Sequence, residues 1–250
     1  MSGHSKWSTI KHQKGVTDAR RGQLFTKLAR EITVAARAGG DNPDMNVRLR
    51  MAIQKARENN MPLDNVDRSI KRGVGGADGG ADSLEETVYE GYGPGGAAIM
   101  LQALTDNRNR TASDVRSYFS KAGGNLGESG CVSWNFESRG VIVGEVGSND
   151  ADNIALTVID GGAEDFKIDG SLIEVYSDVE NLDPLRNILE QQGVTIVSSE
   201  LAMIPLNTVL LDAKFTDQTL KLLDQFEDLD DIQKVYTNAD FADEVLEKYK

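Results

Sequence analysis

An eleven-residue stretch, Gly73-Val74-Gly75-Gly76-Ala77-Asp78-Gly79-Gly80-Ala81-Asp82-Ser83, divides the chain into two parts of different character. It contains five glycines and no large side chain, which is typical of a flexible linker. The formal charge changes sign across it. Residues 1–72 hold fifteen Lys and Arg against seven Asp and Glu, and residues 73–250 hold twelve against thirty-three. We therefore expect a domain boundary between a basic N-terminal part and an acidic remainder.

On the N-terminal side of the linker, the pattern predicts a basic arm followed by a small helical domain, together residues 1–73. Apolar residues at helical spacing predict a helix from about Asp18 to Ala38. A second helix is expected after Asn46, its cap, and a short third one begins near Pro62. Residues 1–17 show no apolar period, so we expect an extended arm that is partly disordered when free.

On the C-terminal side, the pattern predicts two α+β domains, one inserted in the other. Residues 138–204 have the order β-α-β-β-α-β, with a hairpin at Asp169-Gly170, which predicts a split βαβ (ferredoxin-like) domain. The middle domain combines residues 84–137, including a predicted strand at Cys131–Phe136, with the tail 205–250. The tail supplies a helix over Asp217–Asp228 and a strand over Ile232–Thr237. The predicted fold class is therefore α+β and multidomain, with a helical N-terminal domain.

Composition excludes several classes of protein. A chain of 250 residues with 39% hydrophobic and 27% charged residues is typical of a folded globular protein. No apolar run approaches the roughly 20 residues of a membrane span, and no secretory signal opens the chain, so we expect a cytoplasmic protein without a membrane partner. There is one cysteine, and the two histidines both lie in the arm. We expect no metal, no cofactor, no small-molecule substrate and no catalytic residues.

The basic N-terminal part is the first candidate binding region. A basic module beside an acidic body is the electrostatic pattern of a polyanion binder. In the arm, an indole can stack on an unpaired base while lysines hold phosphates, although Trp7 could equally staple the arm to the helical core. The candidate nucleic-acid-binding residues are Lys6, Trp7, Lys11, Lys14, Arg20, Arg21, Lys27, Arg30 and Arg37.

A second candidate is an anion site at a predicted helix start. Three arginines fall within nine positions there, where free backbone N–H groups also favour an anion. Its residues are Asn107, Arg108, Arg110 and Arg116. The alternative is that these arginines pair with Asp106, Asp114 or Glu90.

Four motifs in order resemble the YebC/PmpR family, whose relatives include the mitochondrial translational activator of cytochrome c oxidase. They are Gly3-His4-Ser5-Lys6-Trp7, Asn59-Asn60-Met61-Pro62 with Ile70-Lys71-Arg72-Gly73, Tyr89-Glu90-Gly91-Tyr92-Gly93-Pro94-Gly95-Gly96, and Thr105-Asp106-Asn107-Arg108-Asn109-Arg110-Thr111. The resemblance implies three domains, no catalysis and a role in gene expression. It carries two descriptions of that role: a DNA-binding transcriptional regulator, and a ribosome-associated translation factor that helps synthesis through difficult stretches such as consecutive prolines.

The charge distribution bears on the choice between these descriptions. An acidic body would repel DNA that flanks a bound site, and no helix-turn-helix is evident. A basic arm that orders on structured RNA, with the acidic body turned outward, fits the charge split better. We therefore expect ribosomal RNA or the ribosome as partner, with DNA as the alternative.

Overall fold

The computed structural model describes residues 18–75, 84–147, 151–242 and 244–246. Its N-terminal region consists of three helices, α2 (Asp18–Gly39), α3 (Val47–Glu58) and α4 (Leu63–Val74). Asn46 caps α3, as predicted: its side chain accepts a hydrogen bond from the Leu49 N–H and donates one to the Ala35 carbonyl. The three helices enclose a small core of their own around Ile32, Leu49 and Ala56.

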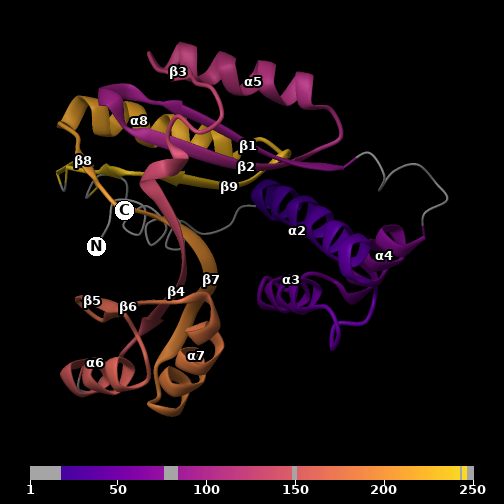
Figure 1. Cartoon of the computed structure of the whole chain (residues 1–250), viewed down its shortest axis with the longest axis vertical. Coiled ribbons are helices and arrows are strands. Elements are labelled where there is room, and N and C mark those ends of the chain that lie inside the picture. The colour runs from indigo at the N-terminus through magenta and orange to yellow at the C-terminus, as the bar shows by residue number, and fades with distance from the viewer. Residues whose placement is uncertain (1–17, 76–83, 148–150, 243, 247–250) are drawn as a thin grey trace.

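The first sheet follows the helical region and has the strand order β3-β1-β2-β9. Its strands are all antiparallel. Helices α5 and α8 cover one face of this sheet (Figure 1), and Phe119 of α5 meets Phe226 of α8 there, with ring centroids 4.8 Å apart. The elements are β1 (Glu85–Tyr92), the 3-10 turn η1 (Pro94–Gly96), β2 (Ala98–Thr105), α5 (Arg108–Lys121), β3 (Asn125–Leu126), α8 (Ala213–Glu227) and β9 (Ile232–Thr237). A two-stranded parallel pair, β8 (Val209–Leu210) and β10 (Ala239–Asp240), lies beside them.

The second sheet has the order β5-β6-β4-β7 and is also antiparallel. Its elements are β4 (Phe136–Glu145), α6 (Ala151–Asp160), β5 (Asp165–Asp169), β6 (Leu172–Ser177), the turn η3 (Val179–Asn181), α7 (Leu182–Gln191) and β7 (Thr195–Pro205). The predicted β-α-β-β-α-β order and α+β class are therefore confirmed. Gly170 at the tip of the β5–β6 hairpin has a φ of 61°, a left-handed conformation that favours glycine.

The predicted strand at Cys131–Phe136 is wrong. Residues Ser133–Asn135 form a 3-10 turn, η2, and only Phe136 belongs to a strand. The buried carboxylate of Glu90 accepts hydrogen bonds from the backbone N–H groups of Gly130, Val132 and Ser133. These donors are therefore not available to a strand ladder, and β3 supplies the edge strand of the first sheet instead.

Two element boundaries also differ from those predicted. Helix α8 begins at Ala213 instead of Asp217, because the Asp212 side chain caps it by accepting from the Phe215 N–H. The glycine-rich stretch begins inside α4, and Gly73 is buried against α2. A Cβ at Gly73 would lie 2.4 Å from the Thr33 carbonyl oxygen, so glycine permits the close approach of α4 to α2.

The three regions contact one another. The two sheets meet through Met100 of β2, Val143 of β4 and their neighbours in one apolar cluster. Figure 1 shows the three N-terminal helices together at one side of both sheets. We retain the division into 1–73, 84–137 plus 205–250, and 138–204 as a proposal. Strand β4 crosses the proposed boundary between residues 137 and 138. The end of β7 lies beside that boundary, because Phe136 of β4 pairs with Pro205 of β7.

Candidate nucleic-acid interface

The basic side chains of the helical region fall into two groups, which differ in the groups they contact. One group faces the rest of the protein. In α2, the Lys27 Nζ donates to the Glu227 carbonyl at 2.5 Å, and the Arg37 Nη2 donates to the Leu84 carbonyl at 2.7 Å. The Arg30 Nη1 lies 2.8 Å from the Asp230 carbonyl and 2.7 Å from the Asp231 Oδ1. The predicted binding residues Lys27, Arg30 and Arg37 therefore help to hold α2 against the first sheet and α8.

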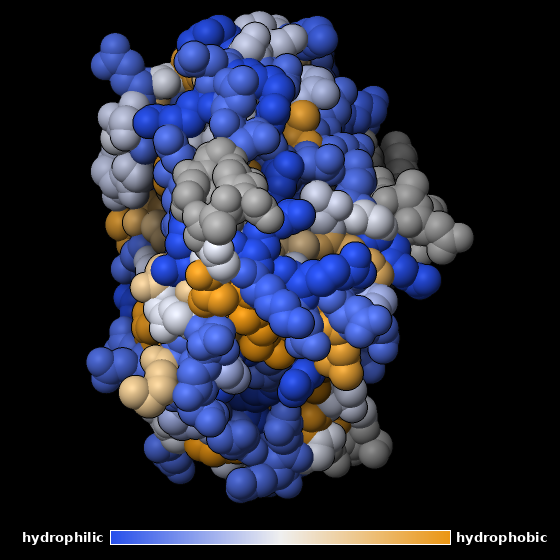
Figure 2. Space-filling view, turned by 90° about the vertical axis from the view of Figure 1, so that its right-hand side faces the viewer, coloured by the Kyte–Doolittle hydropathy of each residue, from blue (hydrophilic) through white to orange (hydrophobic). Residues whose placement is uncertain are grey.

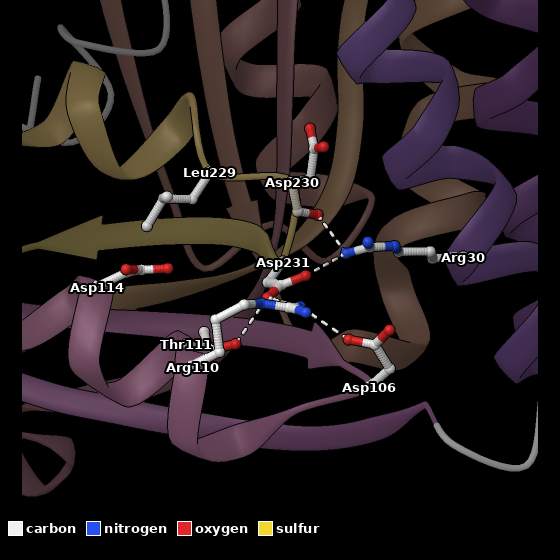
Figure 3. Close-up of a pocket in the computed structure, with 8 residues that line it drawn as sticks. All are labelled: Arg30, Asp106, Arg110, Thr111, Asp114, Leu229, Asp230 and Asp231. Atoms are coloured by element: carbon white, nitrogen blue, oxygen red, sulfur yellow. Dashed lines mark hydrogen bonds and ion pairs between the residues drawn. The ribbon is translucent and has the colours of Figure 1, made fainter.

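Asp231 is the centre of the contact between α2 and the first sheet (Figure 3). Its Oδ2 lies 2.7 Å from the Arg110 Nη2 and 2.7 Å from the Thr111 hydroxyl, while Arg30 reaches its Oδ1 from the other side. Burial raises the pKa of the Asp231 carboxyl, but hydrogen bonds donated by Arg110, Thr111 and Arg30 outweigh it and lower the pKa to about 2. The carboxylate is therefore charged at neutral pH and joins two arginines from distant parts of the chain.

A pocket of about 330 Å³ opens beside this centre. It is lined by Arg30, Asp106, Arg110, Thr111, Asp114, Leu229, Asp230 and Asp231. Four carboxylates against two guanidinium groups give it a negative formal charge, which disfavours an anion inside it.

Helix α3 faces the second sheet in a similar way. The Lys55 Nζ lies 2.9 Å from the Glu200 Oε2 of β7, and the Arg186 Nη2 of α7 lies 3.2 Å from the Glu58 Oε1. Burial raises the pKa of Glu200, but Lys55 and Lys234 outweigh it and lower that pKa well below its ordinary value. Charged pairs thus join the helical region to both sheets.

The second group of basic side chains faces solvent. These residues lie on α3 and α4, and within the described part of the chain none of them forms an ion pair with a carboxylate. We call them the outer basic set: Arg50, Arg57, Arg68, Lys71 and Arg72. Arg50 and Arg57 are seven positions apart, so they project from the same side of α3. Figure 2 shows this side of the molecule, where hydrophilic residues predominate around smaller apolar patches.

The structure does not test the remaining predicted binding residues. Lys6, Trp7, Lys11 and Lys14 lie outside the described residues, and so does the side chain of Arg20. Arg21 is exposed in the first turns of α2. These residues stay predictions. The outer basic set was not predicted as a site from the sequence. Two features of the sequence could have indicated it: Arg50 and Arg57 alternate with apolar positions, and Lys71-Arg72 stands at a helix end.

Three of the four residues of the predicted anion site contact identifiable groups of the protein. Asn107 caps α5 by accepting a hydrogen bond from the Arg110 N–H. Arg110 pairs with Asp106 at 2.8 Å and with Asp231, and Arg108 lies 3.9 Å from Glu85. Arg116 is exposed. Of the alternative ion pairs expected for these arginines, the pair between Arg110 and Asp106 is present. The pair between Arg110 and Asp231 was not predicted. Glu90 instead accepts hydrogen bonds from backbone N–H groups.

The side chains that could ligate a metal, and the one cysteine, are the groups to consider for metal and nucleophile chemistry. No group of three or more His, Cys, Asp or Glu side chains there could hold a metal ion. Burial raises the pKa of the half-buried Cys131 thiol, which favours the unreactive protonated form. None of the described helices is both long and apolar enough to cross a membrane.

The comparisons with known proteins identify the family. Residues 5–76 match the family described as TACO1/YebC protein N-terminal domain, and residues 84–239 match TACO1/YebC second and third domain. The chain therefore belongs to the TACO1/YebC family, which confirms the resemblance drawn from the four motifs.

Similar proteins extend over almost the whole chain. A probable transcriptional regulatory protein of Dehalococcoides mccartyi is 55% identical over 249 residues, covering 100% of this chain and 98% of its own. Another of that description, from Geotalea uraniireducens, is 52% identical over 248 residues and covers 99% of each chain. The crystal structure of the conserved hypothetical protein Aq1575 from Aquifex aeolicus has a TM-score of 0.81 and 44% identity, and covers 90% of this chain and 92% of that one.

Proposed function

We propose that this protein is a non-enzymatic regulator of gene expression that binds nucleic acid through its N-terminal helical region. The observation that carries the proposal is the outer basic set, five exposed cations without carboxylate partners among the described residues. Duplex and structured nucleic acids present closely spaced phosphates, and cations gain affinity by releasing the counterions condensed there. The acidic remainder of the chain, with thirty-three Asp and Glu, repels the same ligand and so restricts binding to this region.

We favour RNA, in the context of the ribosome, as the physiological ligand. The resemblance to the YebC/PmpR family supports a translation factor that eases synthesis through difficult stretches such as consecutive prolines. A body of strong negative charge is compatible with a factor that contacts a large RNA from one side only. The protein would act in the cytoplasm, without a cofactor.

A DNA-binding transcriptional regulator is the second candidate. The observation in its favour is the printed name of the relatives from Dehalococcoides mccartyi and Geotalea uraniireducens, probable transcriptional regulatory protein. The two candidates share the basic surface and differ in the nucleic acid that meets it.

Charge-neutralising variants of the full chain test the proposal. We expect Arg50→Gln with Arg57→Gln to weaken binding to structured RNA and to make the dependence of log K on log salt shallower by about two. The matched control is Lys121→Gln with Lys214→Gln, which removes two exposed cations from the body. If both pairs weakened binding equally, the helical region would not be the interface.

A further inference from the structure

A segment rich in acidic residues lies against the basic face of α2. We call it the acidic turn: Glu227-Asp228-Leu229-Asp230-Asp231, which begins at the last residue of α8 and leads into β9. Three side chains of α2 contact it. The Gln23 Nε2 donates to the Asp228 carbonyl at 3.2 Å, Lys27 donates to Glu227, and Arg30 donates to Asp230 and Asp231.

The chemistry of this contact matches what α2 would meet on a nucleic acid. Residues 23, 27 and 30 are spaced by about one helical turn and so share one face of α2. The acidic turn presents to that face the carbonyl groups at the C-terminal, negative end of the α8 dipole, together with the Asp231 carboxylate. A phosphate backbone presents the same combination of oxygen acceptors and negative charge.

We propose that the acidic turn is an internal competitor for polyanions, an autoinhibitory contact that occupies the basic face of α2. In the docked arrangement the outer basic set is exposed to a ligand, whereas Lys27 and Arg30 are engaged by the acidic turn. Release of α2 from the acidic turn adds Lys27 and Arg30 to the binding surface. This inference rests on the proposed function, since it assumes that the helical region binds nucleic acid.

The contact between α2 and the acidic turn can break without unfolding of the helical region. The helical region has its own apolar core, formed entirely by residues between Leu24 and Ile70, so it need not unfold when it leaves the body. Among the described residues, one apolar cluster joins α2 to the first sheet, formed by Val34, Leu84 and Leu104, and Met51 packs against the core of the second sheet. The hydrogen bonds and ion pairs that also join the helical region to the body are polar, and interfaces rich in polar contacts permit relative domain motion. A polyanion that binds the cations of α2 therefore replaces the hydrogen bonds and the ion pair that the acidic turn made with them.

A cleavable crosslink across the contact tests the inference in the full chain. Gln23→Cys and Asp228→Cys, in a Cys131→Ser background, would be joined by a short bis-maleimide that contains a disulfide. We expect the crosslinked protein to bind a fluorescent structured RNA about tenfold more weakly, because the α2 cations cannot reach phosphates, and reduction to restore binding. The control is Gln23→Cys alone, treated with the same reagent. Equal affinity before and after reduction would overturn the competition while leaving the proposed function intact. Absence of binding in both states would overturn both.

A pair of charge variants provides a test that needs no crosslink. Asp228→Asn with Asp230→Asn keeps the backbone carbonyls that α2 contacts but removes two negative charges beside them. The electrostatic attraction between the acidic turn and α2 is then weaker, so we expect a severalfold gain in RNA affinity. Some gain would follow from reduced overall repulsion, and Glu128→Gln with Glu180→Gln measures it, because these exposed residues lie elsewhere on the body. Equal gains for the two pairs would contradict the inference.

Discussion

Arg30 and Asp231 lie 201 positions apart in the sequence, and the Arg30 Nη1 and the Asp231 Oδ1 are 2.7 Å apart in the structure. Arg30 comes from the basic helical region and Asp231 from the turn before β9. Their ion pair is less exposed than the Arg48–Glu86 pair, which also joins the helical region to the first sheet: the Asp231 side chain is only 10% exposed and the Arg30 side chain 22%. This ion pair both stabilises the fold and, in the inference above, keeps Arg30 of α2 away from a nucleic acid.

Removal of the Asp231 charge should destabilise the protein. Asp231→Asn leaves Arg30, Arg110 and Thr111 without the carboxylate that they share, and the lowered pKa of that carboxyl corresponds to a loss of about 2–3 kcal/mol. The measurement is the free energy of unfolding in urea. Asp230→Asn is the control, since that side chain is exposed, and it should change stability by less than about 0.5 kcal/mol. Equal stability of the two variants would show that the Asp231 contacts contribute nothing.

The same carboxylate predicts an acid-sensitive step in stability. Its pKa is about 2 in the folded protein and about 3.9 in an unfolded chain. Because the folded pKa is the lower one, the stabilisation is fully present above about pH 4 and is lost as the pH falls towards 2. Other carboxylates titrate in this range, so the observable is the difference between the wild-type protein and Asp231→Asn. That difference should shrink between pH 4 and 2; a constant difference would contradict the assignment.

Two glycines in the helical region predict opposite effects of the same substitution. Gly73→Ala places a Cβ 2.4 Å from the Thr33 carbonyl oxygen and should destabilise the protein by about 1–3 kcal/mol. Gly22→Ala, in α2, meets nothing within 4 Å and should stabilise it by about 1 kcal/mol, because alanine is the better helix former. Thermal unfolding of both variants checks the pair. Similar melting temperatures for the two would contradict the close packing of α4 on α2.

The arm carries a prediction that comes from the sequence alone. If Trp7 stacks on an unpaired base, Trp7→Ala should weaken binding to looped RNA by roughly 1–3 kcal/mol, affect duplex DNA less, and leave the melting temperature almost unchanged. If Trp7 instead staples the arm to the helical core, its removal should cost roughly 3–5 kcal/mol of stability and weaken every ligand equally. Measuring both affinities and the melting temperature on one variant separates the two interpretations.

Local patterns predicted much of the fold. Apolar spacing located the three N-terminal helices, and the order of strands and helices predicted the second sheet, because helix caps and hairpin turns depend on residues close in sequence. The Asp231 centre could not be predicted in this way, since its partners come from α2, α5 and the turn before β9. The side of α2 that carries Lys27, Arg30 and Arg37 was interpreted as a ligand-binding face, but it meets backbone carbonyls of the body. Periodicity shows which side of a helix is polar; it does not show which polar group that side contacts.

Crosslinking in living cells tests most directly whether the helical region of this TACO1/YebC-family protein binds RNA. The full chain would be crosslinked with ultraviolet light, the attached nucleic acid sequenced, and the crosslinked peptides identified by mass spectrometry. We predict recovery of ribosomal RNA, attached to peptides from the arm and from α3 and α4. Recovery of promoter DNA on the same peptides would support the transcriptional alternative, and crosslinks confined to residues 84–250 would contradict the claim itself.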